Sequence, residues 1–292
     1  MGSLAAVLLG VVQAVTEFLP VSSTAHLLLV GELLGESLGD PKFRAFVTII
    51  QSGTTLAVLV YFREDLLRIA AAWLRGLRDR NPFATADARL AWYIALGTVP
   101  AAVLGKLLER RIEALGNGVI AFSLVLWGIV LAGAERYASH RRGLDDITAR
   151  SALAIGVGQA LALVPGTSRS GSTITTGMLL GFSREAAARF SFLLSVPIIL
   201  GAGVYKLAKA LPVLRGEPAW RTATVIGTGV SAVAGYLVIG WLLRYLRTRT
   251  TYLFVAWRLA LGVLVAVLLW QGVLPADDDA PAPPAPPAAR AR

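Results

Sequence analysis

Six apolar segments, each about long enough to cross a bilayer, constrain this chain more than any other feature of its sequence. A spanning helix needs about 20 apolar residues. Hydrophobic residues make up 55% of the 292, which exceeds what the core of a soluble protein needs. We therefore expect an all-α polytopic membrane protein with full spans at residues 43–62, 88–108, 117–135, 186–207, 221–243 and 251–273.

Two further apolar stretches are interrupted at their middle. The first breaks at Pro20 and the second at Pro165-Gly166, and hydroxyl side chains follow both breaks. Non-helical backbone at membrane depth persists where protein or a wet cavity satisfies its polar groups. The pattern predicts two re-entrant helical hairpins, which with the six spans make ten helical segments; two complete spans joined at Pro20 are the alternative. No basic region or clear cleavage site marks a signal peptide, so we expect residues 3–19 to be mature structure.

An internal repeat relates the two halves, because three patterns recur in the same order. Each half has one hairpin and three spans, an odd number of crossings, so the second unit enters from the opposite face. We predict an inverted-topology repeat, with units at about residues 1–137 and 150–274, in a single membrane domain over residues 1–275. The matched patterns are Gln13-Ala14 with Gln159-Ala160, Phe46 to Tyr61 with Phe190 to Tyr205, and Gly97-Thr98 with Gly227-Thr228.

Charge and composition predict the orientation in the membrane, an interfacial helix and a disordered tail. The net charge is +10, but the basic residues lie in short loops between apolar segments instead of on one face, which indicates membrane topology and no nucleic-acid partner. The larger basic set, around residues 63–89, 136–150 and 244–249, is expected in the cytoplasm, with both termini and the mouth of the first hairpin on the other side. Residues 66–80 predict an amphipathic interfacial helix, and the Pro/Ala-rich tail 276–292 predicts disorder.

Each interrupted stretch holds a single formal charge. Glu17 is alone in residues 1–31, and Arg169 is alone in residues 151–183. A charge at the bilayer centre costs roughly 2.5 to 3.5 kcal/mol on insertion scales, so such residues line polar cavities and have partners. Broken helices that meet at a repeat interface are typical of membrane binding sites. We predict that Glu17 and Arg169 face one cavity and pair in the resting state.

The first stretch offers a place for a cation. Gln13 and Glu17 lie one helical turn apart and share a face. Together they can position a water or hold Mg²⁺, which takes one or two carboxylates when a phosphorylated ligand supplies further oxygens. The alternative is a packed polar pair with Glu17 protonated.

Hydroxyls after Pro20 predict the start of a second half-helix. Ser22, Ser23 and Thr24 can cap its free N–H groups, and such a helix start attracts anions. His26 can act as a general base or acid near neutral pH, with a hydrogen-bonded packing role as the alternative.

The second stretch predicts an anion site. Arg169 sits in the sequence PGTSRSGST, where a guanidinium can bind phosphate through two hydrogen bonds and backbone N–H groups can form an anion nest. A ligand-free ion pair with Glu17 is the alternative, which leaves the surrounding hydroxyls unexplained: Thr167, Ser168, Ser170, Ser172 and Thr173.

Several known site types are excluded. Walker loops, paired His/Cys metal spacings and Gly-x-Ser-x-Gly elbows are missing from the sequence. Because the chain has no cysteine, disulfides and thiolate metal sites are excluded. Thr175 stands where type-2 phosphatidic acid phosphatases need a nucleophilic His, so that mechanism is excluded too.

At these motifs the chain resembles the undecaprenyl-pyrophosphate phosphatase family, the bacitracin-resistance type of bacterial envelope enzyme. The carrying motifs are Gln13 and Glu17 running into FLPVSSTAH, and PGTSRSGST. The resemblance implies the ten-segment inverted-repeat fold and hydrolysis of a C55 polyprenyl diphosphate, which recycles the carrier lipid for peptidoglycan synthesis. It also implies Mg²⁺ or Ca²⁺ as cofactor and a location in the bacterial cytoplasmic membrane. The distribution of basic residues predicts that the site opens to the extracytoplasmic side.

The resemblance also assigns roles. It implies an essential acid at Glu17, a hydroxyl nucleophile or phosphate ligand at Ser23 and a base at His26. Gln13 departs from the members that have Glu there, although the family signature permits Gln. The resemblance implies phosphate binding at Ser168, Arg169 and Thr173, and from the residue pattern we expect the neighbouring hydroxyls to bind phosphate too: Ser22, Thr24, Thr167 and Ser170. A transporter of a phosphorylated polyprenyl lipid and a membrane scaffold stay open as alternatives, and so does a homodimer.

Overall fold

In a computed structural model, residues 1–37, 39–113, 115–214 and 217–275 of the chain are described. This part of the chain is all-α, with eleven α-helices and two short 3₁₀ helices. Six of the helices are long and apolar enough to span a membrane, which confirms the six segments expected from the sequence. They are α3 (Pro41–Tyr61), α5 (Ala86–Glu113), α6 (Asn117–Tyr137), α9 (Arg184–Ala210), α10 (Pro218–Thr248) and α11 (Tyr252–Trp270). The tail 276–292, expected to be disordered, lies outside the described residues.

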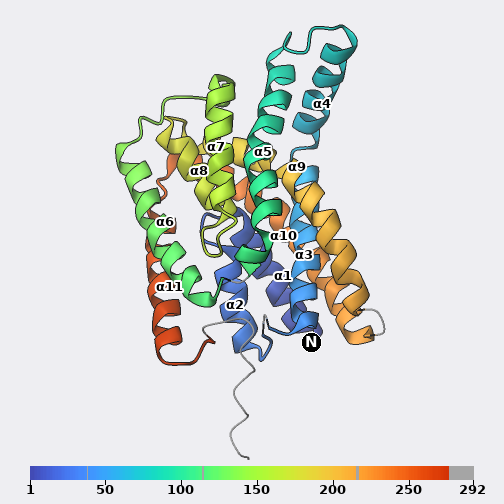
Figure 1. Ribbon diagram of the computed structural model, residues 1–292, viewed down its shortest axis with the longest axis vertical. Helices are drawn as coiled ribbons and strands as arrows, with labels where there is room; N and C mark the ends of the chain where they lie inside the picture. Colours follow the sequence, from blue (N-terminus) through green and yellow to red (C-terminus); the bar gives the residue numbers. More distant parts are fainter. Residues whose placement is uncertain (38, 114, 215–216, 276–292) are drawn as a thin grey trace, which may run out of the picture.

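The long helices run between two ends of the molecule. Figure 1 shows the N-terminus, the end of α9 and the start of α10 at the lower end, and the connections from α4 to α5 and from α6 to α7 at the upper end. Local signals start several of these helices. The Asp40 carboxylate accepts from the backbone N–H of Lys42 before α3, and Ser183 caps α9 in the same way through Ala186.

Two pairs of short helices are interleaved among the long ones. The first pair is α1 (Ser3–Phe18) with α2 (Ser23–Leu33), and the second is α7 (Ala149–Leu161) with α8 (Arg169–Leu179). None of these four helices exceeds 16 residues, which is shorter than a span requires. In Figure 1, α2 lies low in the molecule and α7 rises at its top, so the two pairs approach its middle from opposite ends.

The two breaks share an unusual backbone conformation. Ser22 before α2 has φ 73° and Ser168 before α8 has φ 72°, a left-handed region that non-glycine residues rarely occupy. Pro20, Val21 and Ser22 are buried, so the first break is not the external loop that two complete spans would need. The repeat expected from the sequence therefore has equivalent backbone turns at equivalent places.

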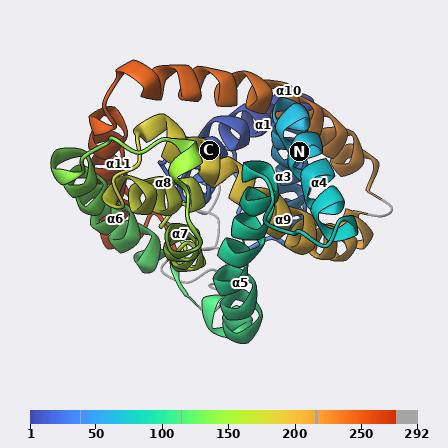
Figure 2. The same ribbon diagram turned by 90° about the horizontal axis from the view of Figure 1, so that it is seen from above.

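Matched glycines bring the short helices against the long ones. A Cβ on Gly10 of α1 would lie 2.7 Å from the carbonyl oxygen of Gly227 in α10, and a Cβ on Gly156 of α7 would overlap the carbonyl oxygen of Gly97 in α5. Gly97 and Gly227 are the residues that the internal repeat aligns. Figure 2 shows the resulting arrangement, with α1 beside α10 and α7 beside α5. These close crossings fix where each pair of short helices packs along its long partner helix.

The expected amphipathic segment forms α4 (Arg63–Arg78), three residues earlier than the start predicted at residue 66. Its buried side is not left free, because Figure 1 shows α4 beside the first part of α5, and the Trp73 ring meets the Trp92 ring edge-on at 5.8 Å. Leu67 and Leu74 are exposed on its other side. The interfacial position of α4 stays a prediction.

Candidate active site

The first hairpin presents a carboxylate at its tip. Glu17 lies in the last turn of α1, and its side chain is 7% exposed. Its Oε2 accepts hydrogen bonds from Gln13 Nε2 at 3.3 Å and from Ser23 Oγ at 3.2 Å. A negative charge opposes the helix dipole at this end, so the position needs a cationic partner.

The second hairpin supplies that partner. Arg169 begins α8, and its Nη2 lies 3.1 Å from Glu17 Oε1. A second contact joins the hairpins, because Ser170 Oγ donates to the carbonyl oxygen of Leu19 at 2.9 Å. The other terminal guanidinium nitrogen, Nη1, is buried without a hydrogen-bond partner in the described chain. The two tips therefore meet as predicted, and one donor of Arg169 is left for a ligand.

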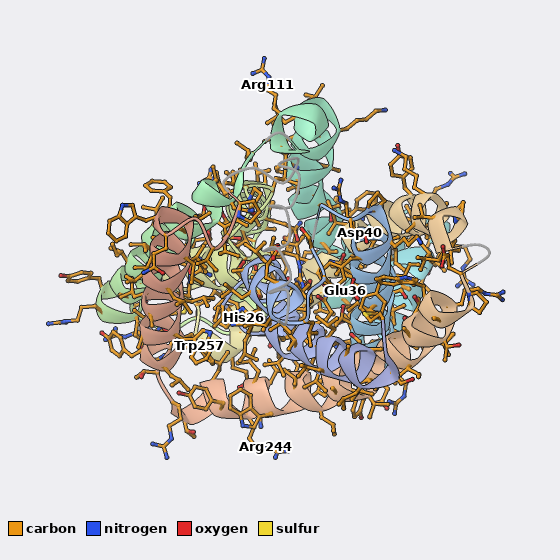
Figure 3. All side chains as sticks on the ribbon, turned by 90° about the horizontal axis from the view of Figure 1, so that it is seen from below. His26, Glu36, Asp40, Arg111, Arg244 and Trp257 are labelled. Carbon is orange, nitrogen blue, oxygen red and sulfur yellow. The ribbon has the colours of Figure 1, made fainter. Side chains whose placement is uncertain are left out.

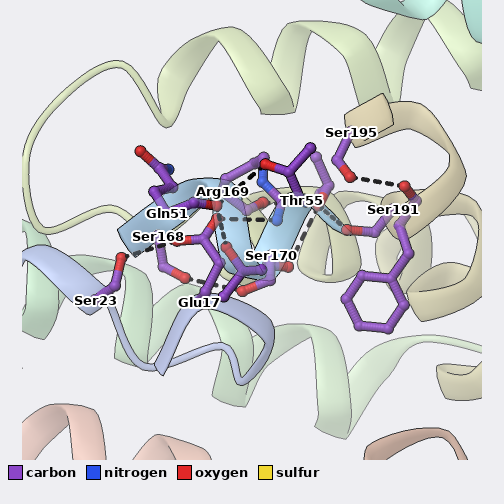
Figure 4. Close-up of polar contacts among 12 residues, drawn as sticks. Glu17, Ser23, Gln51, Thr55, Ser168, Arg169, Ser170, Ser191 and Ser195 are labelled. Atoms are coloured by element: carbon purple, nitrogen blue, oxygen red, sulfur yellow. Dashed lines mark hydrogen bonds and ion pairs between the residues drawn. The ribbon is translucent and has the colours of Figure 1, made fainter. Parts of the chain in front are cut away.

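A pocket of about 590 Å³ lies between the hairpins and the long helices. Figure 4 shows Glu17 and Ser23 facing Ser168 and Arg169, with α3 alongside. Four polar residues of α3 also line this pocket at helical spacing: Thr48, Gln51, Ser52 and Thr55. The wall thus combines one carboxylate, one guanidinium and several neutral donors, a set suited to an anionic phosphorylated ligand.

The remaining wall of the pocket is apolar. It includes Leu56 and Leu59 of α3 and Ile198 of α9, next to the polar groups. Ile112 and Leu207 also line the pocket, and they lie near the C-terminal ends of α5 and α9. Both of these helix ends point toward the side of the molecule where the N-terminus lies. A ligand with a polar head and an apolar tail fits this division.

A second arginine holds both hairpin breaks in place. Arg258 of α11 is fully buried, and its guanidinium donates to the carbonyl oxygens of Pro20, Gly166 and Thr167 at 3.1 to 3.2 Å. It also reaches two carbonyls of α6. No carboxylate in the described residues pairs with Arg258, which therefore stabilises the loop carbonyls as a buried cation.

The oxygen atoms at the site can be compared with those that a divalent cation needs. The described residues contain no cluster of three or more His, Cys, Asp or Glu side chains that could hold a metal ion by themselves. Glu17 offers one carboxylate, and Gln13 and Ser23 offer neutral oxygens beside it. Such a set fits Mg²⁺ or Ca²⁺ when phosphate oxygens and waters complete the coordination.

A protein family described as "Bacitracin resistance protein BacA" matches residues 6–264 of the chain. The chain belongs to the BacA family. It is 71% identical over 291 residues to an undecaprenyl-diphosphatase of Anaeromyxobacter sp. (strain Fw109-5), covering 100% of this chain and 96% of the relative. It is 48% identical over 276 residues to an undecaprenyl-diphosphatase of Myxococcus xanthus (strain DK1622), covering 94% of this chain and 91% of the relative.

In this BacA-family chain the expected site residues divide into two groups. Glu17 and Arg169 line the pocket together with the hydroxyl residues Ser22, Ser23, Thr24 and Ser168. The Ser22 side chain does not cap α2. The first backbone N–H groups of α2 therefore have no hydrogen bond to a capping side chain. Ser168 does cap α8, because its Oγ accepts from the N–H of Gly171 at 3.1 Å.

The other expected residues support the pocket from outside its wall. Gln13 bonds to Glu17 from an adjoining cavity of about 120 Å³. Ser170 and Thr173 are fully buried, and Thr173 Oγ1 lies 2.6 Å from Ser191 Oγ of α9. Thr167 is buried and contributes its carbonyl to Arg258. We therefore find no direct pocket contact for these four side chains.

His26 is turned away from the pocket of this BacA-family chain. Its Nε2 lies 2.8 Å from Nε1 of Trp257, and the two rings are nearly parallel, at 4°, with centroids 5.9 Å apart. Figure 3 labels both residues, which lie side by side. Indole N–H only donates, so Nε2 accepts, and the proton sits on Nδ1, which donates to the carbonyl oxygen of Ser22 at 2.7 Å. Both ring nitrogens are engaged, and the predicted role of His26 as a base gains no support from this geometry.

Two groups of residues at the site were not predicted from the sequence, namely Arg258 and the polar face of α3. Arg258 is the only formal charge in residues 251–273, so the reasoning that singled out Glu17 and Arg169 applies to it equally. The polar residues of α3 recur at helical spacing inside an apolar span, which predicts one polar face. Both signals were present in the sequence.

Proposed function

We propose that the chain removes the terminal phosphate of undecaprenyl diphosphate in the pocket between the two hairpin tips. The BacA family, and relatives up to 71% identical that are named undecaprenyl-diphosphatase, make the chain an undecaprenyl-diphosphatase. The observation that carries the assignment of the site is the pairing of Glu17 with Arg169 at 3.1 Å inside a pocket that also holds Ser23 and Ser168. Hydrolysis yields undecaprenyl phosphate and inorganic phosphate.

The membrane arrangement follows from the paired short helices. We infer two re-entrant hairpins related by an inverted repeat within one membrane domain over residues 1–275. The equivalent turns at Ser22 and Ser168 and the matched crossings at Gly10 and Gly156 support this arrangement. Half-helices that meet near the midplane are typical of sites in inverted-repeat membrane proteins.

Both hairpins offer donors for the head group of the lipid. The free Nη1 of Arg169 and the uncapped N–H groups at the start of α2 are the donors placed for phosphate oxygens. Because Glu17 already pairs with Arg169, the substrate phosphates share the guanidinium with that carboxylate. Preorganised donors of this kind stabilise the charge that develops during phosphoryl transfer.

Attack on the terminal phosphorus falls to Ser23. Its Oγ donates to Glu17 Oε2 at 3.2 Å, so Glu17 is placed to take the hydroxyl proton as the Ser23 oxygen bonds to phosphorus. The bridging P–O bond breaks, its electron pair leaves with undecaprenyl phosphate, and water then hydrolyses the phosphoserine to release phosphate. Direct attack by a water activated by Glu17 and His26 is the alternative; the bonds of His26 to Ser22 and Trp257 argue against it.

Glu17, Gln13 and Ser23 are the residues that would hold a divalent cation, Mg²⁺ or Ca²⁺, together with oxygens of the substrate. When bound, the cation neutralises charge on the diphosphate. The apolar wall formed by Leu56, Leu59 and Ile198 would take the first isoprene units of the lipid.

The active site is proposed to open to the extracytoplasmic side of the bacterial cytoplasmic membrane. Residues near the C-terminal ends of α5 and α9 line the pocket, and these helix ends point toward the side of the molecule where the N-terminus lies. The larger basic set lies in the loops at the opposite end, which the positive-inside rule places in the cytoplasm. Recycling of the carrier lipid for peptidoglycan synthesis, and resistance to bacitracin, follow from this activity.

Purified protein in detergent, given undecaprenyl diphosphate and Mg²⁺, tests the proposal directly. We expect one inorganic phosphate per lipid consumed, loss of the activity with EDTA, and its return with Mg²⁺ or Ca²⁺. If the protein releases no phosphate but moves the lipid across proteoliposomes, the transporter reading is correct instead. Release that is insensitive to EDTA would refute the cation requirement alone.

A further inference from the structure

Gln159 of α7 has a buried carboxamide with no partner. The residue is 3% exposed and lines the pocket that Arg169 and Ser168 also line. Both its Oε1 and its Nε2 lack a hydrogen bond within the described chain. Buried polar side chains are nearly always hydrogen-bonded, and an unpaired one costs stability. An amide held in this way at the wall of a pocket indicates a group that a ligand completes.

The internal repeat makes this amide more informative. Gln159 is the counterpart of Gln13, which is satisfied because its Nε2 donates to Glu17. One turn further along, the counterpart of Glu17 is Leu163, which also lines the pocket. The second hairpin has therefore kept the amide while it lacks the carboxylate that would satisfy it, so the partner of Gln159 must come from elsewhere.

The charges nearby identify the chemistry of that partner. Arg169 is the one formal charge of residues 151–183, it lines the same pocket as Gln159, and its Nη1 is also buried and unpaired in the described chain. Of the two hairpins only the first carries carboxylates, and of these Glu17 lines the pocket whereas Glu32, near the end of α2, does not. A cation is thus favoured beside Glu17, and an anion is favoured beside Arg169 and Gln159.

We propose that Gln159 is a substrate-binding residue whose Nε2–H donates to a non-bridging phosphate oxygen of the diphosphate, next to the Nη1 of Arg169. This inference rests on the proposed function and adds a residue to it. A neutral amide gives directional recognition of a phosphate oxygen without adding a second positive charge that would hold the product phosphate. The first hairpin would then hold the cation and the nucleophile, and the second would supply the side chains that bind the phosphates.

Two substitutions separate this role from a structural one. Gln159→Met keeps the length of the side chain and removes both polar atoms, so we expect the protein to be at least as stable to heat. The KM for undecaprenyl diphosphate should rise roughly tenfold, the amount that one lost hydrogen bond supports. Gln159→Glu replaces the donor by a negative charge beside the phosphates, and its KM should rise further. The Mg²⁺ concentration for half-maximal activity should stay unchanged in Gln159→Met.

Ser231→Ala provides the matched control. Ser231 of α10 is also fully buried with an unpaired oxygen, but it lies outside the wall of the pocket. We expect this variant to keep the wild-type KM. A wild-type KM in Gln159→Met, or an altered Mg²⁺ requirement with the KM unchanged, would overturn the role of Gln159 while leaving the hydrolase intact. Absence of phosphate release by the wild-type protein would instead refute the proposed function.

Discussion

Replacement of Arg258 by Met tests whether one buried cation holds the two hairpin tips together. The guanidinium donates to the loop carbonyls of Pro20, Gly166 and Thr167, and these carbonyls accept no other backbone or side-chain hydrogen bond in the described chain. Methionine has a similar length and makes none of these bonds. The carbonyls of both breaks would lose their donor in the same variant.

The expected loss of stability follows from these contacts. A buried carbonyl that loses its partner costs about 1 to 3 kcal/mol, so three of them cost about 3 to 9 kcal/mol. Removal of a desolvated cation offsets part of this, and broken buried charge interactions typically cost about 3 to 5 kcal/mol in net terms. At about 2 °C per kcal/mol for a chain of this size, the unfolding midpoint should fall by roughly 6 to 10 °C.

Thermal unfolding in detergent, followed by tryptophan fluorescence, measures this shift. Arg244→Met is the matched control, because Arg244 lies exposed near the end of α10 (Figure 3). We expect the control to unfold within about 1 °C of wild type, as surface substitutions usually do. Phosphate release by Arg258→Met at a temperature where the protein remains folded should fall at least tenfold, since the tips lose their fixed separation. A wild-type midpoint with wild-type activity would refute the role of Arg258.

Three further substitutions test other parts of the structure. Gly156→Ala should destabilise the protein by about 1 to 3 kcal/mol because its Cβ would overlap the backbone of α5, whereas Gly118→Ala, with open space around it, should be neutral in the same unfolding assay. Ser23→Ala should lower kcat at least 1000-fold if Ser23 is the nucleophile, and residual activity above about 10% would favour attack by water. His26→Gln should leave the pH dependence of kcat/KM unchanged; loss of a basic limb would show instead that His26 acts as the base.

The long helices and the central ion pair were predictable because each depends on a strong local signal. Spans of about 20 apolar residues allow few alternatives in a bilayer, and a lone charge such as Glu17 or Arg169 must find a partner there. Both expectations are confirmed, by six helices of sufficient length and by the 3.1 Å ion pair. The repeat then indicated which lone charges would meet.

Side-chain direction was not predictable in the same way. The position of His26 three residues after Ser23 suggests a site residue, but the partner that turns its ring is Trp257, more than 200 residues away. Likewise, α4 has an amphipathic pattern that fits a membrane interface, while its buried side is covered by α5 through Trp73 and Trp92. Tertiary partners decide such cases, and periodicity does not identify them.

Phosphate release by variants of the ion pair tests most directly whether the meeting hairpin tips form the active site. Glu17→Gln and Arg169→Met should each lower the rate of release from undecaprenyl diphosphate at least 100-fold, because each removes a charge that acts on the transferred phosphate. Arg63 and Glu64 form an exposed ion pair at 2.9 Å on α4, so Arg63→Met and Glu64→Gln serve as matched controls that should keep the wild-type rate. Wild-type release by either folded pocket variant would contradict the assignment of the site to the two tips.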